Sequence, residues 1–179
     1  MLNASIKMKI NLSCFKAMLA GSLFIAVCAC QDKTPISPSP KAEENEAKDK
    51  KAVDELIAEL KKKHPEAEFG ESKSGLQYFV IKEGKGDKAG KGRDIKAHYT
   101  GRFLDGKKFD SSRDRGEPLA FKVGVGQVIK GWDVALSDMN KGEQRILIIP
   151  PNLAYGERGA GGVIPPNATL VFDVELVDF

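Results

Sequence analysis

The sequence predicts an α+β domain in which antiparallel strands surround one short helix. Its last segment, residues 168–177, alternates between apolar and polar side chains, as a strand with one buried face does. Other apolar segments of strand length are separated by glycine- and proline-rich turns, and a single short segment among them has helical spacing. The side chains expected to face the core from the last strand are Leu170, Phe172, Val174 and Leu176.

The remaining strands are predicted by short apolar runs between turn residues. Residues 103–109 are typical of a hairpin, because Asp105-Gly106 supplies the turn. Residues 82–93 form a loop rich in glycine and lysine, which lacks the spacing and the following Ser or Thr of a phosphate-binding loop. The other strands are expected at residues 76–81, 95–100, 119–123 and 144–149.

The short helix of the domain is predicted by apolar residues three and four positions apart. It ends before the Asn-Lys-Gly sequence at residues 140–142. We expect the sheet to curl around this helix. Its apolar side chains are Trp132, Ala135, Leu136 and Met139.

A longer amphipathic helix is predicted at residues 49–63, ahead of the domain. Three lysines in its last turn suit the helix dipole, and His64-Pro65 ends it. A helix of about 15 residues is marginal alone, so its apolar stripe must pack against something. Packing against its own domain is favoured over the alternative, a dimer contact that would make a weak homodimer. The stripe consists of Val53, Leu56, Ile57 and Leu60.

The first 29 residues are typical of a signal peptide, with three lysines, no acidic residue and an uncharged apolar run at residues 17–27. This run is too short to span a bilayer, which needs about 20 residues. Its end resembles a bacterial lipoprotein signal, in which Ala29 precedes Cys30 as the lipidated residue. An ordinary secretory signal with incidental cysteines is the alternative.

The lipoprotein resemblance implies an anchored protein of the bacterial cell envelope. Because Gln31, and not Asp, follows Cys30, it implies the outer membrane, facing the periplasm. Residues 30–48 cannot bury much apolar surface and are expected to be a flexible tether. The amphipathic helix and a linker then occupy residues 49–73, and the domain occupies residues 74–179.

Charge and composition exclude several classes of function. The net charge is +3, and the leader alone contributes three lysines, so the remainder is neutral and gives no reason to expect nucleic-acid binding. All three cysteines lie at or before Cys30, so the mature domain has no internal disulfide. With only two histidines, neither a metal site nor a cofactor is expected. His98 is interpreted as a structural, hydrogen-bonded residue.

Aromatic and apolar side chains are the remaining candidates for a site, although they could simply form the core. Two of them, Phe109 and Tyr155, lie in turn-rich segments rather than within strands. Asp110 and Arg115, which carry opposite charges, flank the turn at Phe109 as if holding its shape.

Five segments resemble those of the FKBP-type peptidyl-prolyl cis/trans isomerases, in that family's order and spacing. The resemblance covers about residues 75–179. It implies a curved antiparallel sheet, or half-barrel, wrapped around the short helix, with a pocket between them. The segments are HYTG at 98–101, KFDSS at 108–112, VIKGW at 128–132, AYG at 154–156 and IPPNATLVFDVEL at 164–176.

The resemblance also implies roles for single residues. Trp132 forms the pocket floor, Tyr155 contributes its hydroxyl, and the backbone N–H of Ile129 contacts the substrate carbonyl. Asp110 lies at the rim, where Arg115 would pair with it. The remaining substrate contacts are Tyr99, Phe109, Leu119, Phe121, Val128, Ile164 and Phe172, with Leu119 at a position where well-known members often have an aromatic residue.

An apolar pocket suits this reaction. Rotation about a peptide bond has a barrier of about 18–20 kcal/mol, because resonance stabilises the planar amide. The twisted amide has lost resonance and charge separation, so a dry pocket favours it over the planar form. Together with the resemblance, this predicts an isomerase that acts on unfolded, proline-containing exported proteins and binds tacrolimus- or rapamycin-type ligands. The alternative is a holdase chaperone or peptide-binding module whose isomerase activity is incidental.

Overall fold

The structure is a computed structural model that describes residues 40–179, with side chains described from residue 48 onward. The predicted signal peptide at residues 1–29, the lipidation site Cys30 and the tether up to residue 39 lie outside the described residues. All the described residues fall within one compact unit. In this part of the chain, no helix is long and apolar enough to cross a membrane.

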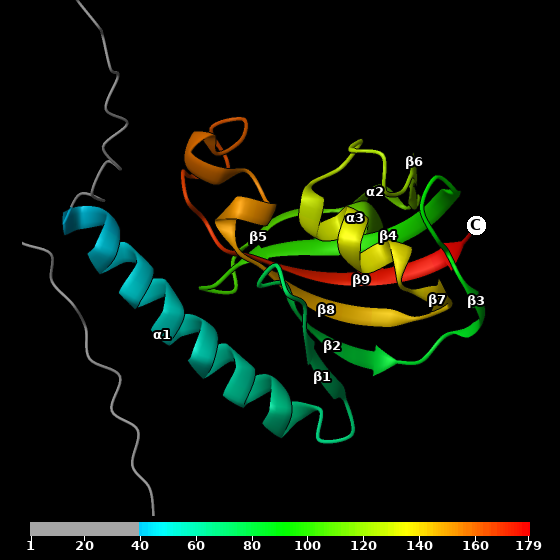
Figure 1. The fold of residues 1–179 in the computed structure, drawn as a ribbon, viewed down its shortest axis with the longest axis horizontal. Coiled ribbons are helices and arrows are strands. Elements are labelled where there is room, and N and C mark those ends of the chain that lie inside the picture. Colours follow the sequence, from blue (N-terminus) through cyan, green and yellow to red (C-terminus); the bar gives the residue numbers. More distant parts are fainter. Residues whose placement is uncertain (1–39) are drawn as a thin grey trace, which may run out of the picture. The chain divides into compact units, whose positions relative to one another are not determined.

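The main sheet of the described residues has seven strands, all paired antiparallel (Figure 1). Their order is β1-β2-β8-β9-β4-β5, and β6 pairs with the first residues of β4. The register of β4 shifts at Lys96/Ala97 and at Gly101/Arg102, and such bulges bend a sheet. The strands are β1 (Glu68–Glu71), β2 (Gln77–Lys82), β4 (Asp94–Phe103), β5 (Lys108–Ser111), β6 (Leu119–Lys122), β8 (Gln144–Ile149) and β9 (Leu170–Asp178).

The two faces of this sheet bury different side chains, because successive residues of a strand point to opposite sides. On β8, Leu147 and Ile149 belong to the larger core cluster, whereas Ile148 belongs to a second, smaller cluster. On β9 the predicted alternation is confirmed. Its four apolar side chains expected in the core are at most 4% exposed, and all of them join the larger cluster.

The short helix predicted within the sheet is α3, Lys130–Ser137. Its first turn buries Trp132 in the larger cluster, while Val134 is 43% exposed. Gly131 lets the helix approach β8, because a Cβ there would lie 2.6 Å from the side chain of Ile149. The predicted α+β fold, a curved antiparallel sheet around one short helix, is therefore confirmed.

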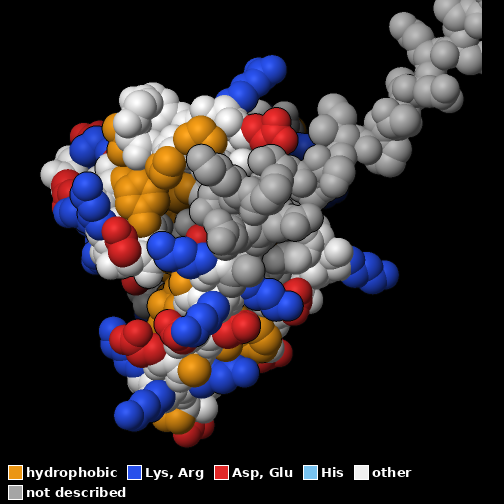
Figure 2. All heavy atoms as spheres, turned by 90° about the vertical axis from the view of Figure 1, so that its left-hand side faces the viewer, with side chains coloured by type: hydrophobic (Ala, Val, Ile, Leu, Met, Phe, Trp, Pro, Cys, Tyr) orange, Lys and Arg blue, Asp and Glu red, His pale blue; other side chains and the backbone are white. Residues whose placement is uncertain are grey.

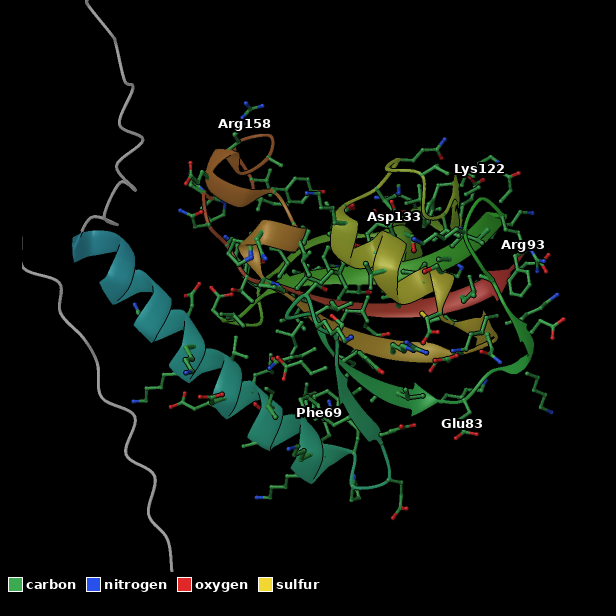
Figure 3. The ribbon with its side chains drawn as sticks, viewed as in Figure 1. Phe69, Glu83, Arg93, Lys122, Asp133 and Arg158 are labelled. Atoms are coloured by element: carbon green, nitrogen blue, oxygen red, sulfur yellow. The ribbon has the colours of Figure 1, made fainter. Side chains whose placement is uncertain are left out.

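The N-terminal helix α1 packs on the opposite face of the sheet (Figure 1). Leu60 is 8% exposed and forms the smaller cluster with Phe79 of β2 and Ile148 of β8. Figure 3 shows Phe69 of β1 beside the same helix, where Lys61 Nζ lies 4.8 Å from the centroid of its ring. The apolar stripe of α1 thus packs against its own domain, the arrangement that the sequence favours.

α1 spans Pro40–Lys63, so it begins nine residues before the predicted start at residue 49. The prediction of a flexible tether over residues 30–48 is therefore wrong for residues 40–48. Proline suits the first turn of a helix, and the residues after it are mostly Ala, Glu and Lys, which are strong helix formers. A segment that cannot bury apolar surface can still extend a helix whose later turns are anchored on a sheet.

Two short strands lie in segments predicted to be irregular. β1 falls inside the expected linker and pairs with β2, so the sheet begins before the predicted domain boundary at residue 74. β3, Lys85–Lys88, lies in the predicted glycine–lysine loop and forms a separate two-stranded sheet with β7, Asn140–Lys141. Gly84 permits this contact, because a Cβ there would lie 2.7 Å from the Cβ of Asn140.

Candidate active site

Five aromatic rings meet on the α3 side of the sheet and are named here the aromatic cluster. Trp132 packs edge-to-face on Tyr99, with ring centroids 4.9 Å apart, and on Phe172, at 5.3 Å. Phe121 lies 5.8 Å from Trp132, and Phe109 packs edge-to-face on Phe172 at 5.6 Å. Such pairs contribute about 0.5–1.5 kcal/mol each beyond their burial. The fold therefore brings together five predicted site residues from β4, β5, β6, α3 and β9.

Trp132 lies at the bottom of the aromatic cluster. It is 4% exposed, and its indole Nε1 has no hydrogen-bond partner among the described residues. A buried N–H without a partner costs free energy. The surroundings of Trp132 are apolar, which is the environment expected for a site that disfavours a planar, charge-separated amide.

Gly101 allows Phe109 to lie against β4. A Cβ at this position would lie 2.5 Å from Cζ of Phe109 and 2.9 Å from Cε1 of Phe172. Phe103, further along β4, packs on Phe109 with 4.9 Å between ring centroids. Sequence reasoning missed both Gly101 and Phe103 as parts of the site, although a glycine inside a strand often marks a close approach.

Polar groups meet at one edge of the aromatic cluster. The Tyr99 hydroxyl donates a hydrogen bond to Oδ2 of Asp110, and Nη1 of Arg115 forms an ion pair with Oδ1 of Asp110 at 2.6 Å. Nη2 of Arg115 also donates to the Tyr99 hydroxyl over 2.7 Å. Arg115 is the last residue of α2, Ser112–Arg115. The pairing of Asp110 with Arg115 that the resemblance implies is present.

Opposing effects act on the ionisation of Asp110. Partial burial disfavours its charged form, but hydrogen bonds from Tyr99 and Arg115 outweigh burial and lower the pKa of Asp110 below its usual value. Burial, together with the hydrogen bond to Asp110, raises the pKa of Tyr99. At neutral pH Asp110 is therefore a carboxylate, and Tyr99 is the neutral hydroxyl that donates to it.

Ser112 fixes the backbone at Tyr99. It is fully buried, and its Oγ accepts a hydrogen bond from the backbone N–H of Tyr99 at 2.8 Å. The same Oγ lies 3.0 Å from Nδ1 of His98, so the interpretation of His98 as a structural, hydrogen-bonded residue is confirmed. Sequence reasoning missed Ser112, since no pattern distinguishes it from Ser111 beside it.

The segment before α3 presents a backbone donor. Asp133 accepts hydrogen bonds from the N–H groups of Gly124 and Gly126, at 2.7 and 2.8 Å, and so ties this segment to the helix (Figure 3). Val128 and Ile129, at the end of the segment, are partly buried against the larger core cluster. Within the described residues the N–H of Ile129 donates to no acceptor. It is therefore available to a ligand.

The connection between β8 and β9 contains two single-turn helices, η1 (Pro151–Leu153) and η2 (Gly156–Arg158). Tyr155 between them is 41% exposed, and burial together with the negative charge of Asp110 raises the pKa of its hydroxyl. Ile164, which is 9% exposed, holds this connection on the core. Figure 2 shows hydrophobic side chains grouped in the upper part of one face.

Leu119 is the predicted contact residue that the fold leaves outside the core. It is the first residue of β6, is 37% exposed and does not join the larger cluster, although Phe121 on the same strand does. The reason is its place at the beginning of a short strand that pairs only with β4.

The site can bind and orient a ligand through apolar surface and hydrogen-bond donors. Among the described side chains, no group of three or more His, Cys, Asp and Glu residues is placed to hold a metal ion. The carboxylate of Asp110 is engaged by Tyr99 and Arg115. The aromatic surface and the hydrogen-bond donors beside it suit a reaction that works by differential binding.

Comparison with known proteins assigns the family. The sequence model described as FKBP-type peptidyl-prolyl cis-trans isomerase matches residues 85–177. The chain belongs to this family. FK506-binding protein 1 of Dictyostelium discoideum is 54% identical over 105 residues, which are 59% of this chain and 98% of that protein. The peptidyl-prolyl cis-trans isomerase FPR2 of Saccharomyces cerevisiae is 62% identical over 92 residues, which are 51% of this chain and 68% of that protein.

A solved structure extends the likeness beyond the matched domain. FkpA from Escherichia coli is 43% identical with a TM-score of 0.62, over 77% of this chain and 62% of that chain. With the family match, this likeness confirms the fold and the FKBP-type isomerase activity expected from the sequence.

Proposed function

We propose that this chain isomerises X–Pro bonds in unfolded exported proteins, and that the aromatic cluster and its edge are the active site. The observation that carries the proposal is a pair of free donors beside a dry aromatic surface. The backbone N–H of Ile129 and the hydroxyl of Tyr155 make no hydrogen bond within the described residues. Ile129 packs against the core cluster that contains Trp132, and Tyr155 lies near enough to Asp110 to feel its charge.

The mechanism follows from these contacts. The proline ring packs against the aromatic cluster, and the N–H of Ile129 holds a substrate carbonyl. The Tyr155 hydroxyl donates to the carbonyl that turns as the amide twists. Hydrogen bonds that strengthen in the twisted state, in surroundings that disfavour the planar one, lower the barrier without a nucleophile.

Asp110 has a positioning role in this mechanism. Its carboxylate accepts from Tyr99 and pairs with Arg115, so it fixes the hydroxyl of a ring that forms part of the aromatic cluster. Burial, and to a lesser extent the negative charge of Asp110, raises the pKa of the Tyr155 hydroxyl.

The same surface is proposed to bind tacrolimus- and rapamycin-type ligands. The support is the aromatic cluster itself and the identity of 54% with a Dictyostelium discoideum protein named for FK506 binding. A calorimetric titration should show binding at micromolar ligand, and a flat titration with folded protein would contradict this assignment.

The isomerase proposal is tested with a Leu-Pro peptide and the chain without its predicted signal peptide. Tyr155→Phe removes one hydroxyl and should lower kcat/KM about two- to tenfold, as the loss of one hydrogen bond does. Absence of acceleration by folded wild-type chain would overturn the proposal. Suppression of client aggregation by that inactive chain would then identify a holdase.

We also propose that Cys30 is lipidated and anchors the chain in the cell envelope, at the outer membrane facing the periplasm. The support is the uncharged run at residues 17–27, followed by Ala29-Cys30-Gln31. Labelled palmitate should enter the wild-type chain and not a Cys30→Ser variant. Equal labelling of both chains would contradict the anchor, and recovery in the inner membrane would contradict the location.

A further inference from the structure

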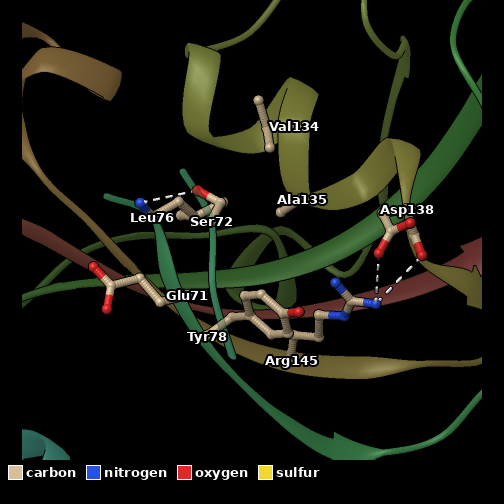
Figure 4. Close-up of a pocket in the computed structure, with 8 residues that line it drawn as sticks. All are labelled: Glu71, Ser72, Leu76, Tyr78, Val134, Ala135, Asp138 and Arg145. Carbon is tan, nitrogen blue, oxygen red and sulfur yellow. Dashed lines mark hydrogen bonds and ion pairs between the residues drawn. The ribbon is translucent and has the colours of Figure 1, made fainter. Parts of the chain in front are cut away.

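A hollow lined by charged and apolar side chains lies beside α3 (Figure 4). It has a volume of about 150 Å³ and lies between α3, which contributes Val134 and Ala135, and the strands β1 and β2, with Asp138 just after the helix. Val134 is two residues after Trp132, or roughly 200° around the helix axis. α3 therefore separates this hollow from the aromatic cluster.

A second hollow of about 210 Å³ lies further along the same strands. Arg145 of β8 lines both spaces. Together they are named here the Arg145 hollows. Because successive residues of a strand alternate between faces, Arg145 shares the face of Leu147 and Ile149, which pack in the larger core cluster. A buried cation on this face requires hydrogen-bond or ion-pair partners. The groups that contact Arg145 therefore indicate which kind of ligand the hollows can bind.

The side chain of Arg145 is only 8% exposed and is held on three sides. Its Nε donates to Oε1 of Glu143, its Nη2 donates to the backbone oxygen of Asp138 over 3.3 Å, and its guanidinium lies 4.8 Å from the ring centroid of Tyr78. Nη1 has no hydrogen bond to any residue between 48 and 179. In Figure 4 the guanidinium lies between Tyr78 and α3, at the hollow. Nη1 of Arg145 is thus left at the hollow to donate to a carbonyl oxygen of an occupant.

The charge around the Arg145 hollows is negative. Glu143 is neutralised by Arg145, and Asp138 by Lys88. Three further carboxylates line the hollows, are exposed and have no ion pair within the described part of the chain. This balance rejects an anionic occupant and attracts a cationic one. The three carboxylates are Glu68, Glu71 and Glu83.

Apolar surface accompanies these carboxylates. Leu76 and Ala135 are 1% and 3% exposed and form one wall of the first hollow, and the half-exposed Val134 lies at its border. Tyr78 adds an aromatic surface. An apolar wall beside carboxylates fits a long aliphatic side chain that ends in a cation, as in lysine and arginine.

We propose that the Arg145 hollows bind a lysine- or arginine-bearing segment of the client polypeptide, close in sequence to the proline that the active site holds. The basic side chain lies along Val134 with its charge at Glu71, and Nη1 of Arg145 donates to a backbone carbonyl of the client. This assignment rests on the proposed isomerase function, because it takes the occupant to be part of the substrate.

The length of α3 sets the spacing between the two sites. The helix begins next to Ile129, and its eight residues span about 12 Å. An extended chain covers that distance in about four residues. The basic residue is therefore expected about four or more residues from the proline.

The test compares peptides that differ at one residue. Each has a Leu-Pro bond and, five residues away, either Lys, Gln or Glu. The wild-type chain should show a KM about two- to fivefold lower for the Lys peptide than for the Gln peptide, and highest for the Glu peptide. The ratio should approach one in 1 M salt, where exposed charges are screened. Equal KM values for the three peptides at low salt would overturn the proposal.

Two charge reversals locate the effect. Glu71→Lys should abolish or invert the ratio between the Lys and Gln peptides. Glu59→Lys makes the same change of charge on α1, which packs on the other face of the sheet, and should leave the ratio intact. If both variants change the ratio equally, net charge and not the hollow is responsible, and the assignment is wrong.

A proline-free Lys peptide separates this proposal from the isomerase proposal. It should shift the amide NMR signals of Ser72, Leu76 and Ala135 in the wild-type chain, and a Glu peptide should not. These shifts do not depend on catalysis, so they would survive even if the chain failed to isomerise proline peptides. Absence of shifts in a chain that does isomerise would refute the Arg145 hollows alone.

Discussion

Different kinds of side chain are buried on the two sides of α3: aromatic rings on one side and a charged arginine on the other. On one side, Trp132 is surrounded by aromatic rings, and even its indole N–H has no partner among the described residues. On the other side, the buried Arg145 is held by Glu143, by the backbone at Asp138 and by the ring of Tyr78. The aromatic side is lined by rings, whereas the ionic side contains the Arg145 hollows.

The difference follows from what each kind of contact requires. Apolar rings are stabilised by close packing, and they can adjust their positions to fill small gaps. The attraction within a buried ion pair offsets the cost of desolvation only where the geometry is good and the other polar atoms are hydrogen-bonded. These contacts hold the side chains in fixed positions. One helix of eight residues thus lies between an aromatic cluster and a hollow whose charges come from neighbouring segments.

The largest effect is expected on the aromatic side, from Trp132→Ala. Removing a buried indole should lower the free energy of unfolding by about 3–5 kcal/mol and reduce kcat/KM at the same time. Urea unfolding and the Leu-Pro assay measure the two losses. Trp132→Phe is the matched control, because the indole N–H that it removes has no partner to lose. A Phe variant as unstable as the Ala variant would show that the indole N–H contributes to stability.

Arg145→Ala tests the ionic side. It leaves Glu143, only 5% exposed, without its cationic partner, and this should lower the free energy of unfolding by about 3–5 kcal/mol at neutral pH. The double variant Arg145→Met with Glu143→Leu should recover most of that loss, because no uncompensated charge remains. Denaturant unfolding of the three chains decides the matter, and a double variant no better than the single would mean that the charges are not the cause.

The sequence predicts the aromatic side better than the ionic side. The alternation of β9 places Phe172 and Val174 in the core, and the motif segments place Trp132 beside them. Arg145 had a readable signal, since it shares the strand face of Leu147, but its partner Asp138 is not determined by any local pattern. Such contacts depend on the tertiary structure, whereas sequence periodicity predicts only which face of a helix or strand a residue occupies.

The same limit explains the other differences. The pairing of β3 with β7 joins segments more than fifty residues apart and depends on Gly84 meeting Asn140. The early start of α1 at Pro40 is different, because helix propensity over residues 40–48 was available in the sequence. Leu119 is exposed because it is the first residue of β6. An apolar residue type alone does not indicate this exposure.

Gly101→Ala should have a smaller effect, confined to the aromatic side. Its Cβ would lie 2.5 Å from the ring of Phe109, so the ring must move, at a cost of about 1–3 kcal/mol in the free energy of unfolding. The activity should fall because Phe109 lies in the proposed site. Adding Phe109→Leu should restore stability and not activity, as measured by thermal unfolding and the Leu-Pro assay. If the second substitution restores nothing, the clash is not with Phe109.

The smallest effect concerns pH and the edge of the aromatic cluster. The pKa of Asp110 is lower in the folded chain than its usual value of about 3.9. Its stabilising contribution is therefore complete above that value and is lost as the pH falls through the folded-state pKa. Because Asp110 is 42% exposed, water screens the interaction, and the contribution should be below about 1 kcal/mol. Asp110→Asn should reduce the decrease in the free energy of unfolding between pH 5 and 2. If the decrease is unchanged, other carboxylates are responsible for it.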